Sequence, residues 1–390
     1  MFVEGVKDIG KTFLIKKIFA GSYFSLDEEN ILEMIKLNPN FIFESKRPIF
    51  IDEWQIYPTI FNLVKRQIDE KNENGMFLLS GSSTPKKNVN ILHSGAGRFM
   101  RIRMLPLTLT ELNISTRKIN LEALFTNKQL NSSINEFIIA KYIDIICKGG
   151  RTRLNDITNI DICIKKNINY IENIIDKTND EKNITKQTLI KILKSLSRNI
   201  SQNTDILTIS KDAGISETSA KRYLNFLEEC FLYSPLEVWN THIRSTIQLR
   251  TKPKIHLVDP CFAVASLNLN EVKLQANMNY LGLVFESLVI RDLRTYSEYL
   301  NYKIYYYRDN SNLEIDCIIE NNNDEIIAIE IKLGSDVGIA EGIKSLNRFK
   351  NKISDQSKIK SLNIITAQNK TYTTVEGINI ISFGDLYVDF

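Results

Sequence analysis

Apolar residues divide the chain into two α/β parts separated by a helical middle. Continuous apolar runs at 48–55 and 75–81 alternate with amphipathic segments such as 11–20. Runs of this kind are typical of parallel strands that helices cover on both faces. A further strand with alternating apolar residues is predicted around 100–104. The pattern therefore predicts a parallel-sheet α/β core in the first hundred residues.

The middle of the chain is predicted to be helical from residue 113 to about 204. Apolar residues recur at helical spacing in 134–150 and 167–177, and the pair Gly149-Gly150 is a helix stop. Residues 205–238 predict a short helix, a turn at Gly214, a second helix capped by Ser216 and a terminal strand pair. Together these elements would form a winged helix.

The C-terminal part begins with an amphipathic helix at 279–300 and continues with strands. KIYYYRD, LEIDCII and EIIAIEIKLG read as three strands joined by turns at 310–312 and 321–324. We predict four domains: a parallel-sheet α/β core at 1–112, a helical region at 113–204, a winged helix at 205–240 and a second α/β domain at 241–390.

Composition is that of an ordinary globular protein. The chain has 390 residues, of which 43% are hydrophobic and 25% charged, and its net charge of +4 does not by itself indicate a nucleic-acid partner. The five cysteines are scattered without a C-x-x-C pair, which favours a reducing cytoplasm over disulfides or zinc. No apolar run is long enough for a membrane span, and no signal peptide is recognised. A cytoplasmic protein is predicted.

Residues 5–12, GVKDIGKT, match the spacing G-x-x-x-x-G-K-T of a phosphate-binding loop. Gly5 and Gly10 permit the tight turn that points backbone N–H groups at phosphates, and Lys11 reaches the β- and γ-phosphates. The Thr12 hydroxyl would bind Mg²⁺, and the helix that follows adds its positive end. The other residues of this predicted nucleotide site are Val6, Lys7, Asp8 and Ile9.

Asp52 and Glu53 end the apolar run of 48–55, at the carboxyl end of the predicted strand. Parallel sheets bind ligands at this end of their strands. Asp52 is therefore predicted to hold magnesium and Glu53 to polarise the attacking water, on a strand next to the one that enters the loop. A solvated acidic turn is the alternative.

Polar residues beyond 75–81 extend the candidate site. Ser80 and Ser82 are placed to sense the γ-phosphate, although serines are also common in turns. Arg98, in a Gly-rich loop, is a candidate arginine finger for a nucleotide on a neighbouring subunit, or a surface charge. The finger role requires a homo-oligomer.

The ordered series GVKDIGKT, YFSLDEE, PIFIDEWQ, FLLSGSS, HSGAGR and LPLTLTEL resembles the AAA-type ATPases of bacteria and archaea that carry a C-terminal DUF4143 region. The resemblance covers most of the chain. It implies ATP and Mg²⁺ as ligands, with Lys11, Thr12, Asp52 and Glu53 in the roles above. It also implies a lid after the core and a C-terminal region similar to PD-(D/E)XK nucleases.

Three features depart from the family pattern. Only Met1–Glu4 precede the loop, where members usually have a helical arm and a full strand. Asp8 places a carboxylate inside the loop, where it opposes phosphate binding. Arg151 and Arg153 follow the glycine pair in place of Phe-Pro, and they are interpreted as surface charges, with phosphate contact as the lesser alternative. The first two features predict a weakened nucleotide site.

DNA contact is predicted through the second helix of the winged helix, where Lys221 and Arg222 would face the major groove. Acidic neighbours such as Glu217 weaken this face, and winged helices also serve only as packing modules. A looser basic stretch is suited to nonspecific backbone contact: Arg244, Arg250, Lys252 and Lys254.

A second constellation has the D…E-x-K order of PD-(D/E)XK folds, although Ile315 replaces the motif's proline. Glu330 and Lys332 are two apart on one strand, so they share a face on which Asp316 can join them. Asp316, Glu330 and Glu286 would bind Mg²⁺, and Lys332 would activate the hydrolytic water. The alternative is a cross-strand salt bridge of Lys332 with Glu330 or Glu314 in an inactive nuclease-like scaffold. The sequence thus leaves two functions open, an ATPase with a metal-dependent nuclease domain and a non-cleaving ATP-dependent switch.

Overall fold

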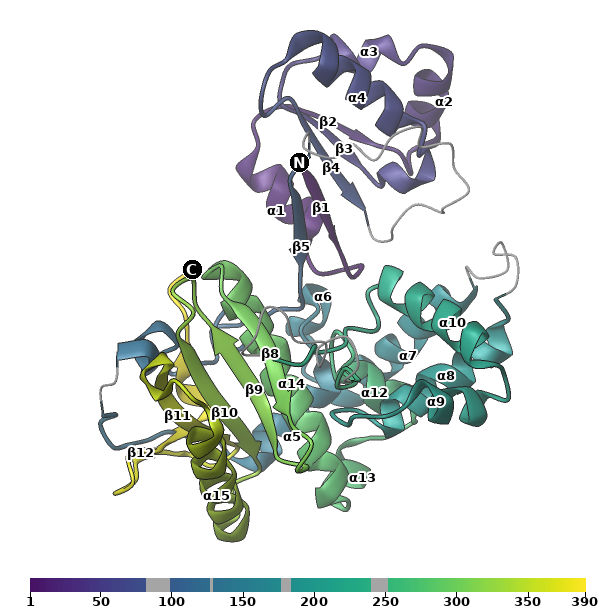
Figure 1. Cartoon of the computed structure of the whole chain (residues 1–390). Coiled ribbons are helices and arrows are strands. Elements are labelled where there is room, and N and C mark those ends of the chain that lie inside the picture. The colour runs from purple at the N-terminus through teal and green to yellow at the C-terminus, as the bar shows by residue number, and fades with distance from the viewer. Residues whose placement is uncertain (82–98, 127–128, 177–183, 240–251) are drawn as a thin grey trace. The chain divides into compact units, whose positions relative to one another are not determined.

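The computed structural model describes residues 1–81, 99–126, 129–176, 184–239 and 252–390 (Figure 1). These residues form two compact units. The N-terminal unit comprises residues 1–106, 151–153 and 227–231, and the C-terminal unit comprises the rest. The last three of the four predicted domains fall almost entirely in the C-terminal unit. Ser82 and Arg98 lie outside the described residues, so their predicted roles stay predictions.

The N-terminal unit is built on a parallel sheet, as predicted. Its strands lie in the order β2-β3-β4-β1-β5, and all four neighbouring pairs are parallel. Their bounds are β1 Phe2–Gly5, β2 Ser22–Ser25, β3 Ile49–Asp52, β4 Phe77–Gly81 and β5 Arg101–Met104. Because β4 lies between β1 and β3, the prediction that these two strands are neighbours is wrong. Apolar runs indicate buried strands but not their order.

The four residues before the loop form most of β1, an interior strand of the sheet. It pairs on one side with β4, where Phe2 lies opposite Leu79, and on the other side with β5. The Met1 amino group donates to the Phe77 carbonyl at 2.9 Å, and the Met1 carbonyl accepts from the Leu79 amide at 2.9 Å. The short stretch Met1–Glu4 therefore supplies the strand that the loop needs.

Helices cover the two faces of this sheet unequally. On one face, the core of Phe2, Ile51 and Leu79 packs with residues of α2 (Glu29–Leu37), α3 (Asn40–Phe43) and α4 (Ile60–Lys71). On the other face, Ile15 of α1 (Lys11–Ile18) packs against a smaller cluster that contains Val3, Phe50 and Leu78. Alternate residues of each strand face opposite layers, as expected for strands buried on both sides.

The helical part of the C-terminal unit begins later than predicted. Its helices are α5 Ile139–Lys148, α7 Ile160–Asp176, α8 Lys186–Arg198, α9 Ile206–Ala213, α10 Glu217–Glu229, α12 Cys261–Ser266 and α13 Glu271–Gln275, with α6 Thr152–Asn155 beside them. Gly149 ends α5 at φ +79°, as predicted, and an added Cβ would lie 2.5 Å from Cys261 Sγ. Gly214 ends α9, and the Ser216 hydroxyl accepts from the Ser219 amide at the start of α10.

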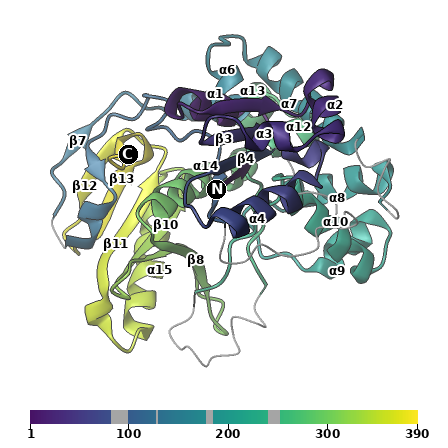
Figure 2. The same ribbon diagram turned by 90° about the horizontal axis from the view of Figure 1, so that it is seen from above.

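Among the described residues, the C-terminal sheet has seven strands in the order β7-β12-β13-β11-β10-β9-β8. Their bounds are β7 Ser133–Ile134, β8 Lys303–Arg308, β9 Glu314–Glu320, β10 Ile326–Lys332, β11 Ile359–Thr366, β12 Lys370–Thr373 and β13 Asn379–Ser382. β10, β11 and β13 are parallel, and the other pairs are antiparallel. The helix α15 (Asp336–Lys352) packs Leu346 and Phe349 onto this sheet (Figure 2), and α14 (Met278–Tyr299) also contacts β8, β9 and β10.

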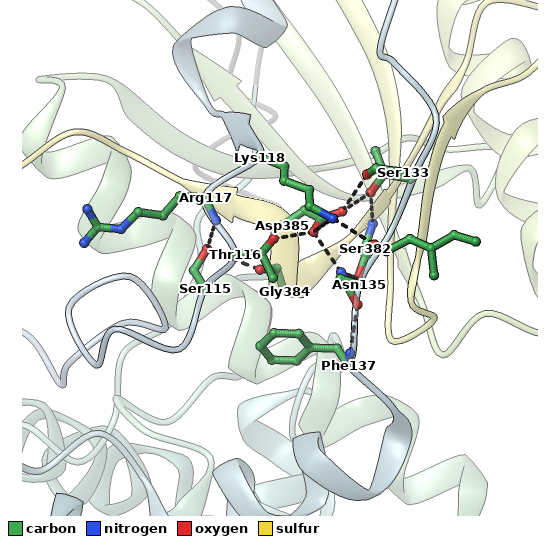
Figure 3. A network of polar contacts seen from close by, with 12 residues as sticks. Ser115, Thr116, Arg117, Lys118, Ser133, Asn135, Phe137, Ser382, Gly384 and Asp385 are labelled. Carbon is green, nitrogen blue, oxygen red and sulfur yellow. Dashed lines mark hydrogen bonds and ion pairs between the residues drawn. The ribbon is translucent and has the colours of Figure 1, made fainter.

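The described residues of 113–137 contain no α-helix, only a 3-10 helix at Glu122–Thr126, which corrects the sequence prediction. They include two short strands: β7 joins the C-terminal sheet by pairing with β12, and β6 (Ile119–Asn120) forms a separate two-stranded sheet with β14 (Leu386–Tyr387). Figure 3 shows the polar network that holds this segment. The fully buried Asp385 carboxylate accepts from Thr116 Oγ1 at 2.5 Å, Asn135 Nδ2 at 2.9 Å and Thr371 Oγ1 at 2.6 Å. The segment lacks a helical apolar repeat, and strand edges of the C-terminal sheet satisfy its backbone instead.

Candidate functional site

The loop between β1 and α1 has the backbone that a phosphate site requires. Gly5 and Gly10 take φ values of +150° and +89°, which favour glycine. A Cβ on Gly5 would lie 2.2 Å from the Met104 carbonyl oxygen, so no other residue fits there. Lys11 is buried at the start of α1, and its Nζ donates to the carbonyls of Gly5 and Val6 at 2.9 Å each. The ammonium thus lies inside the loop.

Thr12 and Asp52 meet although they come from different strand ends. The Thr12 hydroxyl donates to Asp52 Oδ2 at 2.7 Å, and Asp52 is itself buried. Tyr23 OH donates to the same oxygen at 3.2 Å, and the Ser80 hydroxyl donates to Oδ1. Ser80 therefore orients the carboxylate from the intervening strand β4. A hydroxyl and a carboxylate are hard oxygen donors of the kind that Mg²⁺ prefers, so the pair fits the predicted cation.

Glu53 follows Asp52 in a strained backbone conformation. Its φ is +51°, a left-handed value that is uncommon for a residue with a side chain. Its carboxylate accepts a hydrogen bond from Gln55 Nε2, and its amide donates to Asp52 Oδ1 at 3.1 Å. Strained residues cluster at functional sites because surrounding contacts must hold them. Both acidic residues of the prediction therefore lie at the end of β3 that faces the loop.

Electrostatics at the loop centre on Lys11. Burial lowers the pKa of Lys11 to about 8, although the nearby carboxylates of Glu53, Asp52 and Asp8 oppose this shift. The ammonium is therefore charged at neutral pH but close to the range in which it loses its proton. An anion placed in the loop would raise this pKa again.

In the C-terminal unit, the predicted constellation converges, but around a residue that the sequence analysis did not select. Lys254 is 1% exposed, and its Nζ contacts Glu286 Oε1 at 2.7 Å, Glu314 Oε1 at 2.8 Å and Asp316 Oδ1 at 2.9 Å. We call these four residues the Lys254 cluster. The sequence analysis had placed Lys254 in a surface basic stretch for nucleic-acid contact, and its burial shows that this is wrong.

Backbone pairing brings Lys254 to the carboxylates. Residues 232–236 run antiparallel to 254–258, with bonds in both directions between the backbones of Leu236 and Lys254 at 2.9 Å. The same segment joins the edge strand β8 through Val238 and Tyr306. Lys254 and His256 then share the buried face of this short ladder. The only sequence signal is two polar residues alternating with Ile255 and Leu257.

Lys332 closes the other side of this cluster. Its Nζ lies 2.5 Å from Glu330 Oε2 and 3.4 Å from Asp316 Oδ2, and the Ile331 amide donates to Asp316 Oδ2 at 2.9 Å. Glu330 and Lys332 thus share a face of β10, as predicted. Lys332 therefore contacts Glu330 and Asp316 together.

The acidic residues of this region differ in how their pKa values are shifted. Burial raises the pKa values of Glu286 and Glu330 to about 8, and the Asp316 charge adds to both shifts. Lys254 and Lys332 outweigh burial at Asp316 and hold its pKa well below its usual range. Burial alone would lower the pKa of Lys254, but the three carboxylates raise it well above the ordinary value. Lys254 therefore stays a cation at any physiological pH.

The cluster holds an internal cation at the position where the sequence analysis predicted Mg²⁺. Within the described part of the chain, no group of three or more His, Cys, Asp or Glu side chains is arranged to hold a metal ion. The ion pair of Lys332 with Glu330 is one of the two that the salt-bridge alternative named, whereas the contacts of Lys254 with Glu286 and Asp316 were not predicted.

The predicted nucleic-acid residues are exposed on α10. Lys221 and Arg222 both face solvent, and the Arg222 guanidinium lies 5.8 Å from the centre of the Tyr223 ring. Glu217 and Glu228 of the same helix are also exposed. Contact of this helix with DNA stays a prediction. The winged helix also stays a prediction: residues 233 and 236 pair with 257 and 254, and residue 238 pairs with Tyr306 of β8.

Comparison with known families agrees with these two units. The AAA domain family matches residues 1–113, and the DUF4143 family, a domain of unknown function, matches residues 281–386. Another domain of unknown function, DUF8612, matches residues 156–273. A search of curated proteins finds no match. Among the helices described, none is long and apolar enough to cross a membrane. The chain thus carries a match to the AAA domain family and a match to the DUF4143 family, the pair of regions that the sequence resemblance predicts.

Proposed function

We propose that the N-terminal unit binds and hydrolyses ATP. The observation that carries this proposal is the contact between Thr12 and Asp52 at 2.7 Å, with the Lys11 ammonium inside the same loop. Lys11 neutralises the phosphates, and backbone N–H groups of the loop hold them. Glu53, held at the end of β3, orients a water molecule and accepts its proton.

Thr12 and Asp52 would hold Mg²⁺, which would supply positive charge against the charge that develops on the phosphates. The chain's own contribution is to keep this pair of oxygens in place. Ser80 and Tyr23 do so by donating to the carboxylate from β4 and β2. Their hydrogen bonds leave Asp52 few other orientations.

Replacing Lys11 with Ala should abolish measurable binding of MgATP. Lys11 is the buried ammonium of this loop, and the variant has no charge in its place. A charge-assisted contact to phosphate contributes about 1.5–3 kcal/mol, so affinity should fall at least tenfold. Isothermal titration calorimetry on the whole protein measures this change. Lys36→Ala, on the exposed part of α2, is the matched control and should bind like wild type. Equal affinity of Lys11→Ala and wild type would contradict the proposal.

ATP affinity should also fall as the pH rises above about 8. The pKa of Lys11 is about 8 without nucleotide, and bound phosphates raise it. The affinity is therefore at its full value below pH 8, where Lys11 is already protonated. Above pH 8, Lys11 must take up a proton when ATP binds, so the affinity falls by up to tenfold per pH unit. Titrations at pH 7 and 9, in buffers of different ionisation enthalpy, measure both effects. Lys11→Arg should show neither, since a guanidinium stays charged.

We further propose that the C-terminal unit does not cleave nucleic acid, so that the protein works as an ATP-dependent switch. The Lys254 ammonium fills the space between Glu286, Glu314 and Asp316 that a catalytic cation would need. A lysine with three carboxylate partners supplies the positive charge itself, and expelling it would leave these acids unpaired.

Incubation of the whole protein with linear or single-stranded DNA, and with Mg²⁺ or Mn²⁺, tests this second proposal. DNA should stay intact under conditions in which ATP is hydrolysed. Degradation that disappears in both Asp316→Ala and Lys332→Ala would instead support the nuclease.

A further inference from the structure

A short segment far along the chain lies directly on the phosphate-binding loop. Residues 151–153 belong to the N-terminal unit, and the Thr152 amide and hydroxyl donate to the Asp8 carbonyl at 3.1 and 2.8 Å. A Cβ on Gly10 would lie 3.2 Å from Thr152 Cγ2, so the loop and the segment are in close contact. Thr152 therefore fixes the backbone of its neighbour Arg153 beside the loop.

Arg153 forms an ion pair with the residue of the loop that opposes phosphate binding. Its Nε lies 3.4 Å from Asp8 Oδ1. Asp8 sits in the middle of the loop at φ +66°, between the glycines. A carboxylate there repels phosphate oxygens. The pair keeps this charge partly neutralised and turns one arginine toward the loop.

The ion pair is weak enough to be exchanged. The Arg153 side chain is 78% exposed, and ion pairs in water contribute little to stability. A phosphate group offers a guanidinium more negative charge and two parallel hydrogen bonds, which makes it the better partner. The side chain can change partners while Thr152 holds the backbone.

Building on the proposed ATP site, we infer that Arg153 binds the nucleotide. In the free protein its guanidinium is instead paired with Asp8. When ATP binds, the guanidinium leaves Asp8 and contacts the phosphates. Asp8 thus competes with the nucleotide for Arg153, and the pair sets the affinity of the loop. Lys11 enters the site from α1, and Arg153 enters it from the segment that follows α5.

A double-mutant cycle tests this exchange. MgATP affinity is measured by calorimetry for the whole protein as wild type, Asp8→Asn, Arg153→Gln and the double variant. Arg153→Gln should weaken binding about tenfold, and Asp8→Asn should strengthen it by about threefold. In the Asp8→Asn background, Arg153→Gln should still weaken binding about tenfold or more, because the arginine's contact is with the nucleotide.

Three further variants separate this role from a structural one. Arg153→Lys keeps the charge and should recover part of the lost affinity. Arg66→Gln removes one exposed positive charge from α4 and should leave affinity unchanged. The thermal unfolding midpoint of the nucleotide-free protein should be the same for wild type and Arg153→Gln, since an exposed ion pair contributes little.

Two results would overturn the inference. If Arg153→Gln has no effect in the Asp8→Asn background, Arg153 is only a counter-ion of Asp8. If Arg153→Gln has no effect in the wild-type background, the pair does not act on the nucleotide at all. Lys11→Ala reports on the proposed function separately: lost binding in that variant, together with either result above, rejects the exchange and leaves the ATP site standing.

Discussion

Replacing Glu53 with Gln should leave MgATP bound while hydrolysis falls by about 10²–10⁴-fold, the usual contribution of a positioned general base. The amide keeps the size of the side chain and can still accept the hydrogen bond from Gln55 Nε2. It cannot take a proton from water, so only the chemical step is affected. Phosphate release at saturating ATP measures turnover, and calorimetry with the same protein measures binding.

The control for this variant is Glu44→Gln, an exposed acid of the same unit, which should turn over ATP like wild type. Equal turnover of Glu53→Gln and wild type would remove Glu53 from its assigned role. A loss of binding together with turnover would show instead that the left-handed backbone at Glu53 depends on its carboxylate.

Replacing Lys254 with Met should destabilise the C-terminal unit by about 3–5 kcal/mol, because a buried ion pair loses one partner and leaves charges uncompensated. The loss should increase with pH. In the wild type, burial raises the pKa of Glu286 to about 8 and Lys254 opposes this shift, so the pKa rises further in the variant. Below about pH 8 both native states keep the Glu286 proton. Above it, the wild type gains a Lys254–Glu286 ion pair that the variant cannot form, so the variant loses more stability.

The chain offers an internal reporter for this measurement. Its two tryptophans fall in different units, Trp54 in the N-terminal and Trp239 in the C-terminal unit. In a Trp54→Phe background, urea unfolding followed by the fluorescence of Trp239 reports on the C-terminal unit, at pH 5.5, 7 and 8.5. Lys252→Met, an exposed lysine two residues away that pairs with Asp205, is the matched control and should change stability by less than about 1 kcal/mol. Equal stability of the two variants would contradict the assigned role of Lys254.

The nucleotide site was largely predictable from the sequence, because its parts are contiguous. Gly5–Thr12 form one motif, and the apolar run before Asp52 fixes the strand end on which that acid lies. The position of β4 between β1 and β3 could not be predicted, since it depends on pairing between distant segments. The contact of Arg153 with Asp8 was missed for the same reason: more than a hundred residues separate them.

The Lys254 cluster was less predictable from the sequence, for a different reason. The spacing of Glu330 and Lys332 correctly placed both side chains on one face of β10. Nothing in the motif indicated that Lys254 would enter from another segment, because its position depends on a ladder with 232–236 that has no local signature. The motif therefore predicted which acidic residues meet. It did not predict that Lys254 lies among them, because the backbone pairing that places Lys254 there is visible only in the structure.

The strands of residues 113–137 determine how this gene can be divided. A fragment that starts at residue 241 would leave β12 without β7 and expose a sheet edge prone to aggregation. Its Asp385 would also lack the donors Thr116 and Asn135. Expression plasmids that begin at residue 107 should yield soluble product where those that begin at 241 precipitate. The upstream stretch is thus expected to be part of the smallest piece of this chain in which the C-terminal sheet folds.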